Sequence, residues 1–228
     1  VSQYTRDQIL RYHGSHFENK LRVIYEGWEH LLFFANETCG YPKDIPFSKY
    51  ILYVGSSRGH KNWGRLIQAI QRASHQLPPD WGFVFIGSTK MLSKKHLQMV
   101  QQLNRQRPII QITGWQEDCS LASYYRHAQA LIFPSLSEGF GIPILEAYFY
   151  RIPLLLSNQA SLPEIAGDAA IYFDPYNVQD ISDSILHFTK QSDHTSLIER
   201  QTQRLARYSW KTTSQQLTKL LQSFCKPL

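Results

Sequence analysis

The chain contains, at residues 135–146, the stretch Ser-Leu-Ser-Glu-Gly-Phe-Gly-Ile-Pro-Ile-Leu-Glu, in which seven residues separate two carboxylates. The apolar run just before it, at residues 130–133, predicts a buried strand, and Pro143 suits the first turn of a helix. Glu138 would then follow the strand end, and Glu146 would lie one turn inside the helix. We therefore expect both acids to face one site.

This arrangement suits a ligand that carries phosphate and hydroxyl groups. Gly139 and Gly141 allow the backbone to approach a ligand closely, and the free N–H groups at a helix start attract phosphate oxygens. Carboxylates accept hydrogen bonds from pairs of sugar hydroxyls. The alternative is an ordinary strand-to-helix turn with solvated acids, because a Gly-x-Gly pattern alone is a weak signal.

Short apolar runs alternate with helical stretches along the whole chain, which is typical of a parallel sheet covered on both faces. The predicted strands lie at residues 21–25, 50–55, 82–86, 109–113, 130–134, 154–157 and 170–173. The predicted helices lie at residues 6–12, 62–75, 93–104, 121–127, 143–150, 178–189, 197–208 and 211–224. We expect residues 26–48 to form a connecting surface loop. The fold class is therefore α/β, and such sheets bind ligands beyond the carboxyl ends of their strands.

Composition excludes several classes of protein. The 228 residues are 43% hydrophobic, which is enough for a substantial core, and carry a formal net charge of +6. The basic residues are scattered and the aromatic residues do not alternate with them, so nucleic-acid binding is not expected. No signal peptide and no apolar run of about 20 residues is present.

The three cysteines, Cys39, Cys119 and Cys225, are far apart and form no Cys-x-x-Cys pair. Their spacing predicts neither a disulfide framework nor a zinc site, and it favours a reducing compartment.

A second loop with chemical potential follows the predicted strand at residues 50–55. It contains Arg58, Gly59 and Lys61 immediately before a predicted helix. Arginine offers a forked set of donors and lysine a mobile charge, and together with the helix start they would neutralise a diphosphate leaving group. The alternative is a loop of solvated cations, with Asn62 as a helix cap.

Two further positions carry weaker signals. Gly114 and Trp115 follow another predicted strand, where backbone amides and an aromatic ring could hold a nucleobase, although Trp115 could equally be a core or rim residue. Glu164 fits the first turn of a short helix, where a carboxylate is favoured on structural grounds alone.

Taken in order, these segments resemble the family 4 (group 1) retaining glycosyltransferases. The resemblance rests on Tyr53–Gly55 with Lys61–Asn62, Thr113–Trp115, Ala130–Pro134 followed by the Glu138–Glu146 element, Pro153, Ser157–Asn158, Leu162–Ala170 and Tyr208–Trp210. It implies the GT-B fold, in which two Rossmann-like domains face each other across a cleft, and identifies this chain with the C-terminal, donor-binding half. The expected parts are the tail of an N-terminal acceptor domain (1–20), a Rossmann-like nucleotide-sugar-binding domain (21–208) and a C-terminal helix (209–228).

The resemblance also implies residue roles. The expected catalytic residues are Glu138, which would orient the sugar and stabilise its developing positive charge, and Lys61 and Arg58, which would hold the diphosphate. The expected donor-binding residues are Gly55, Ser56, Gly114, Trp115, Ser137, Gly139, Phe140, Gly141, Ile142 and Glu146, with Glu146 on the ribose hydroxyls. No metal or other cofactor is expected, because the cations and helix dipoles can neutralise the phosphate and no Asp-x-Asp element is present.

The implied reaction moves a glycosyl group from a nucleoside diphosphate sugar to a hydroxyl acceptor with retention of anomeric configuration. Attack from the same face, with the departing phosphate accepting the proton, would need no dedicated protein base. The acceptor would come through an N-terminal domain or a partner chain. The expected location is cytoplasmic, with peripheral membrane association of the complete enzyme.

Two departures from the family pattern bear on the site. Arg58 follows Ser56 and Ser57 instead of coming directly after the strand glycine, and residues 147–151 are bulky where relatives have small ones.

Two alternatives remain. One is a stand-alone nucleotide-sugar-binding module, or half of a split enzyme, because transfer requires donor and acceptor to be held together with water excluded. On either reading the chain alone is expected to transfer poorly or not at all. A GT-B epimerase or phosphorylase is less favoured. No pyridoxal-lysine environment of a phosphorylase is found, and an epimerase would release free sugar without an acceptor.

Overall fold

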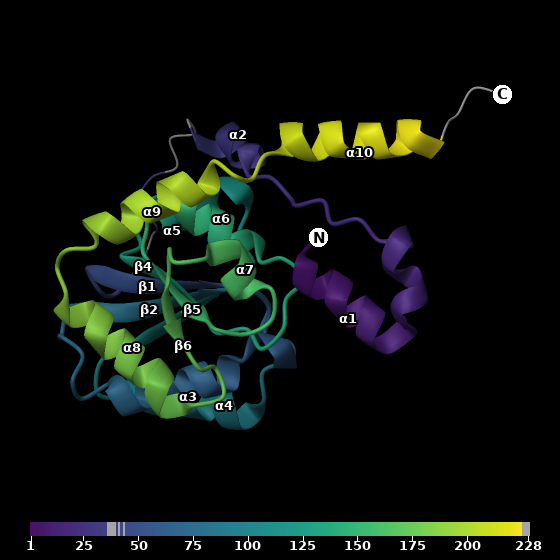
Figure 1. The fold of residues 1–228 in the computed structure, drawn as a ribbon. Coiled ribbons are helices and arrows are strands. Elements are labelled where there is room, and N and C mark those ends of the chain that lie inside the picture. The colour runs from purple at the N-terminus through teal and green to yellow at the C-terminus, as the bar shows by residue number, and fades with distance from the viewer. Residues whose placement is uncertain (36–39, 41, 43, 225–228) are drawn as a thin grey trace.

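Within the residues that the computed structural model describes (1–35, 40, 42 and 44–224), six parallel strands form one sheet in the order β3-β2-β1-β4-β5-β6 (Figure 1). The strands are β1 (Lys49–Val54), β2 (Trp81–Ile86), β3 (Ile110–Gly114), β4 (Ala130–Phe133), β5 (Leu154–Ser157) and β6 (Ile171–Phe173). The predicted parallel α/β sheet is confirmed.

Helices cover both faces of this sheet (Figure 1). The helices are α1 (Gln3–His13), α2 (Leu32–Ala35), α3 (Trp63–Ala73), α4 (Lys94–Asn104), α5 (Asp118–His127), α6 (Ile142–Phe149), α7 (Leu162–Ala166), α8 (Val178–Lys190), α9 (Thr195–Leu205) and α10 (Trp210–Phe224). Short 3₁₀ segments are η1 (Ser15–Lys20), η2 (Glu29–Leu31) and η3 (Gly59–Lys61). The predicted helical C-terminus is therefore confirmed.

Alternating strand residues divide between two hydrophobic cores, as expected for a strand whose successive side chains point to opposite faces. In β1, Tyr50 and Leu52 join the core shared with α5, α6 and α7, whereas Ile51 and Tyr53 join the core shared with α3 and α8. β2, β4, β5 and β6 divide in the same way, whereas β3 gives only Ile110 and Ile112, both to the core shared with α3 and α8. The five strands that divide are thus apolar on both sides, which explains their continuous hydrophobic runs in the sequence.

The predicted strand at residues 21–25 is wrong. This segment runs as extended chain outside the sheet, and its last residue, Tyr25, is hydrogen-bonded to two helices. The Tyr25 carbonyl accepts a hydrogen bond from the Thr213 hydroxyl of α10 at 2.5 Å, and the Tyr25 hydroxyl donates to Glu164 at 2.9 Å. An apolar run pairs as a strand only where a sheet edge is within reach, and here it instead packs between α7 and α10. The predicted loop at 26–48 contains η2 and α2, and part of it lies outside the described residues.

The cysteine spacing does not predict the disulfide that Cys119 forms. The expectation that the cysteines stay unpaired is therefore wrong for this residue. Spacing reveals pairs only when they are close in sequence, because long-range pairing is decided by the fold. Cys39 and Cys225 lie outside the described residues.

Two helices extend beyond the sheet layers. Figure 1 shows α1 at one side of the molecule and α10 running away from it above α1. None of the residues of α10 is buried. The Glu29 carboxylate holds its start, accepting from the main-chain N–H of Trp210 at 2.8 Å and from the Ser209 hydroxyl. No helix in the described part of the chain is both long and apolar enough to cross a bilayer.

The loops that follow β1, β2 and β3 touch through glycine backbones. The Gly87 N–H donates to the Gly114 carbonyl at 2.9 Å, and a Cβ on Gly87, whose φ is +141°, would lie 2.0 Å from the Gly55 carbonyl oxygen. Only glycine fits there without displacing the neighbouring loop.

We predict that Gly87→Ala lowers the free energy of unfolding by about 3 kcal/mol, because the new methyl group clashes with backbone and the φ angle disfavours alanine. Chemical denaturation measures the change. Gly59→Ala is the matched control: no atom lies within 4 Å of its added Cβ, so a change below about 0.5 kcal/mol is expected. Equally small effects at both positions would contradict this packing.

Candidate functional site

The strand order reverses between β1 and β4, which are direct neighbours in the sheet. The helix after β1 (α3) packs on one face of the sheet, and the helix after β4 (α6) packs on the other. The two loops therefore start side by side and diverge. Ligands of open α/β sheets bind at this kind of reversal.

Lys61, from the β1–α3 loop, and Glu138, from the β4–α6 loop, form an ion pair across this point. Their Nζ and Oε1 atoms are 2.8 Å apart, and only 17% and 14% of the two side chains is exposed. The ammonium also lies 5.0 Å from the centre of the Phe133 ring. Oε1 is buried and has no aligned hydrogen bond within the described residues, so the Lys61 charge is what compensates it.

Main-chain contacts hold the two loops together beneath this pair. The Leu136 N–H donates to the His60 carbonyl at 2.7 Å. Asn62 precedes α3 with a left-handed backbone (φ +61°), but its side chain does not cap the helix. Its amide instead donates to the carbonyls of Pro134 at 3.1 Å and Pro175 at 2.8 Å. Asn62 therefore fixes the position of its neighbour Lys61.

Glu146 lies inside α6, as the sequence predicts. Its carboxylate accepts a hydrogen bond from the Tyr125 hydroxyl of α5 and faces a cavity of about 200 Å³ that Asp118, Tyr150 and His30 also line. Burial raises the pKa of Glu146, and the charge of Asp118 adds to this, while the Tyr125 hydrogen bond and Lys61 act in the opposite direction. Both acids of the Glu138–Glu146 element therefore feel the charge of Lys61.

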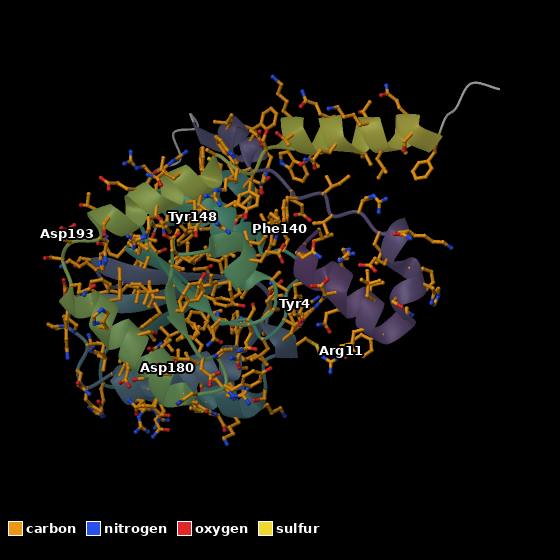
Figure 2. All side chains as sticks on the ribbon, in the orientation of Figure 1. Tyr4, Arg11, Phe140, Tyr148, Asp180 and Asp193 are labelled. Carbon is orange, nitrogen blue, oxygen red and sulfur yellow. The ribbon has the colours of Figure 1, made fainter. Side chains whose placement is uncertain are left out.

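The Gly139–Ile142 loop presents backbone at this site. Gly141 has a φ of +101°, and a Cβ there would lie 2.9 Å from Leu162. The Phe140 side chain turns away into the core, where it is 3% exposed and its ring packs against those of Tyr25 and Tyr208. Figure 2 shows Phe140 on the same side of the sheet as Tyr4 of α1. Only the main chain of Phe140 is therefore placed to meet a ligand.

The remaining predicted residues lie at the carboxyl edge of the sheet. Gly55 and Ser56 directly follow β1, and Gly114 ends β3. Trp115, just beyond it, is 75% exposed, so it is not a core residue. Ser137 is exposed beside Glu138.

Arg58 is separated from Lys61. Its side chain is exposed and lines a cavity of about 630 Å³ between the starts of α3 and α4, together with Arg65, Met91 and His96, whereas Lys61 does not line this cavity. The backbone accounts for the difference, because Arg58 precedes η3 in an extended conformation (φ −61°, ψ 149°), whereas Lys61 is the last residue of η3.

Sequence reasoning missed contacts between α1 and the site. The Glu164 carboxylate accepts the main-chain N–H groups of Gln3 and Tyr4 at 2.7 and 2.9 Å, so it caps α1 instead of acting only within its own helix. The Thr5 hydroxyl donates to the Gly139 carbonyl at 3.2 Å. Pairing Glu164 with residues so distant in sequence requires the fold, and no local signal could have revealed it.

Comparison with known proteins identifies the family. Residues 44–205 of the chain match the family described as glycosyl transferases group 1. The chain belongs to this family.

Several curated relatives of this group 1 glycosyltransferase are mannosyltransferases. The chain is 34% identical over 142 residues to the O-antigen chain mannosyltransferase B of Escherichia coli, covering 62% of this chain and 37% of that protein. It is 25% identical to the O-antigen chain mannosyltransferase RfbU of Salmonella typhimurium, covering 94% of this chain and 56% of that protein. The chain therefore spans about a third to a half of these relatives.

Solved structures show the same fold, which confirms the predicted GT-B-type Rossmann-like domain. A glycosyltransferase from Rickettsia africae superposes with a TM-score of 0.80 at 17% identity, over 100% of this chain and 63% of that one. An Anabaena protein in complex with UDP and glucose superposes with a TM-score of 0.66 at 19% identity, over 86% of this chain and 51% of that one.

Among the residues with described positions, no three His, Cys, Asp or Glu side chains come together as metal ligands would. The expectation of a metal-free reaction stays a prediction.

The raised pKa of Glu146 predicts a pH dependence of stability. Its folded-state pKa exceeds the ordinary value of 4.5, so the folded state takes up a proton before the unfolded state as the pH falls. Wild-type stability therefore gains a contribution as the pH falls through the folded pKa towards 4.5. Glu146→Gln lacks this contribution, so any stability advantage that it has over wild type at neutral pH should shrink on acidification.

Urea denaturation between pH 4.5 and 8 measures this difference. Tyr125→Phe is the companion variant, because it removes a hydrogen bond that lowers the pKa of Glu146. The pH range in which protonation of Glu146 adds to stability should therefore extend to higher pH. A difference between Glu146→Gln and wild type that stays constant with pH would show that Glu146 is not desolvated.

Proposed function

We propose that this chain is the donor-binding part of a retaining hexosyltransferase, which moves a sugar from a nucleoside diphosphate sugar to a hydroxyl acceptor. The observation that carries the proposal is the Lys61–Glu138 pair, 2.8 Å apart at the reversal of strand order. The two charges suit the two sides of the bond that breaks. The Lys61 cation would stabilise the leaving phosphate, and the Glu138 carboxylate would bind the sugar hydroxyls and stabilise the positive charge that develops on the sugar.

Donor binding breaks the ion pair between Lys61 and Glu138. The diphosphate takes Lys61 as its counter-ion, and Glu138, released from Lys61, turns to the sugar hydroxyls. The bond between the anomeric carbon and the phosphate oxygen then breaks, and the acceptor oxygen bonds to that carbon on the same face. The departing phosphate takes the acceptor proton. Because the acceptor bonds on the face that the phosphate leaves, the anomeric configuration is retained.

The other residues support this assignment. The N–H groups of Gly139–Ile142, at the start of α6, would meet the diphosphate and sugar, and Glu146 would accept from the ribose hydroxyls. Trp115 offers an exposed ring to the nucleobase, beside Gly114, Gly55 and Ser56. Because Arg58 lines a separate cavity, we assign the diphosphate to Lys61 first and to Arg58 only after a change of side-chain rotamer.

The names of the relatives suggest which sugar and which class of pathway to test first. Because relatives include O-antigen mannosyltransferases, mannose is the first sugar to test and polysaccharide synthesis the first pathway class. We further propose that residues 1–20 belong to an N-terminal acceptor domain, 21–208 to the donor domain and 209–228 to a C-terminal helix. The acceptor would arrive through that N-terminal domain or a partner chain.

The cellular location stays a prediction. We place the complete enzyme in the cytoplasm with peripheral membrane association, and cell fractionation tests this. Because Cys119 forms a disulfide, the cysteine spacing no longer supports a reducing compartment.

A second candidate is a stand-alone nucleotide-sugar-binding module, or half of a split enzyme. It is supported by the same Lys61–Glu138 pair, which would hold a nucleotide sugar whether or not transfer follows. Transfer that appears only after an N-terminal partner is added would identify a split enzyme, whereas transfer to a defined acceptor by the chain alone would contradict both this candidate and the expectation of an inactive isolated chain.

Thermal-shift titration with UDP-, GDP- and ADP-sugars tests donor binding, since a ligand of the folded state raises Tm with its concentration. One donor should raise Tm, and we expect Lys61→Ala to weaken its binding at least tenfold, through loss of the cation that pairs with Glu138. Glu146→Ala should weaken it similarly.

Arg72→Ala provides the control, because it removes an exposed cation of α3 away from the site. Its donor affinity should equal that of wild type. If no nucleotide sugar binds the wild-type chain, or if Arg72→Ala and Lys61→Ala lose affinity equally, the proposed donor site is refuted.

A further inference from the structure

A second cavity, of about 700 Å³, lies at the opposite edge of the sheet. Lys49 and Trp81, which begin β1 and β2, line it, as do Gln129 and Pro153, which directly precede β4 and β5. The site described above lies beyond the other ends of these strands. Figure 2 shows Asp193, in the loop between α8 and α9 that borders this cavity, far from Phe140 and Tyr4. The volume is within the range of small-molecule sites.

Positive charge dominates this cavity. Three permanent cations, Lys49, Arg151 and Lys190, line it, against one acid, Glu199. Lys49 is already paired with Asp80 at 3.2 Å. Neither the Arg151 nor the Lys190 side chain has an acidic partner among the residues that the structure describes. These two cations are therefore available to an anion.

The rest of the lining suits a ligand with hydroxyl groups. It includes side-chain amides and hydroxyls from Gln129, Gln191, Ser192 and Thr195, over an apolar floor that contains Trp81 and Phe188. His194 stacks on the Phe188 ring, with centroids 4.5 Å apart, and its Nε2 atom is buried without a hydrogen-bond partner in the described part of the chain. A hydroxyl of a bound ligand would satisfy this nitrogen.

The backbone of Arg151 gives independent support. Arg151 follows α6 with a φ of +56°, in the left-handed region. Residues other than glycine are disfavoured in this conformation, and glycine is the usual solution at a helix end. This position therefore carries a guanidinium at the expense of stability, which is the pattern expected where a side chain serves binding.

We propose that this cavity binds a phosphorylated sugar, with the phosphate on Arg151 and Lys190 and the sugar hydroxyls on the amide, hydroxyl and His194 groups. Arginine and lysine together form a strong phosphate site. The site is separate from the donor site and does not depend on the function proposed for it.

The test is isothermal titration of the chain with glucose 6-phosphate and with inorganic phosphate. Glucose 6-phosphate should bind more tightly than phosphate, because it also reaches the hydroxyl-binding groups. Arg151→Gly should weaken glucose 6-phosphate binding at least tenfold while keeping Tm equal to or above that of wild type. This separates loss of binding from loss of folding. Lys190→Ala should weaken binding as well.

Lys61→Ala distinguishes the two sites. It should leave glucose 6-phosphate binding unchanged, because Lys61 does not line this cavity. Unchanged affinity in Arg151→Gly, equal affinity for glucose 6-phosphate and phosphate, or loss of binding in Lys61→Ala would each overturn the proposal.

Discussion

The Lys61–Glu138 ion pair joins two loops that the chain topology brings to one place and then sends to opposite faces of the sheet. Its two charges are held at 2.8 Å with little exposure to solvent, where removing one partner would leave the other uncompensated. A ligand that replaces one member must therefore supply an equivalent charge. In the function that we propose, a diphosphate would supply it to Lys61, and the sugar hydroxyls would supply hydrogen bonds to Glu138.

Contacts around the ion pair hold the loop backbones in place, so replacing one member of the pair would move only side chains. The hydrogen bonds from Leu136 to His60 and from Asn62 to Pro134 hold the loop backbones independently of the ion pair. The close glycine contacts at Gly87 and Gly141 fix the neighbouring loops by sterics. Binding of the proposed donor would therefore redirect two side chains without changing the loop backbones. The contact of Thr5 with Gly139 also places α1 beside the loop that would meet the sugar.

The sequence predicts much of this structure where the signal is local. Apolar runs on both strand faces, helical periodicity and the Glu138–Glu146 spacing predict the α/β order and place both acids after β4. Contacts between distant segments have no such signal: the Tyr125–Glu146 hydrogen bond, the capping of α1 by Glu164 and the disulfide of Cys119 depend on the tertiary fold. Residues 21–25 have a strand pattern but no sheet edge to join. The left-handed backbone of Arg151 contradicts its local propensity, so neither this conformation nor the cavity beside it has a local signal.

The exchange at Lys61 is tested most directly by the affinity of Glu138→Gln for two ligands of the same nucleotide. Removing the carboxylate charge frees Lys61, so the nucleoside diphosphate without sugar should bind more tightly to Glu138→Gln than to wild type. The ratio of the nucleotide-sugar affinity to the nucleoside diphosphate affinity should be lower in Glu138→Gln than in wild type, because the sugar loses its charged partner. If both ligands bind Glu138→Gln and wild type with the same affinities, the ion pair does not give way to the donor and the account is wrong.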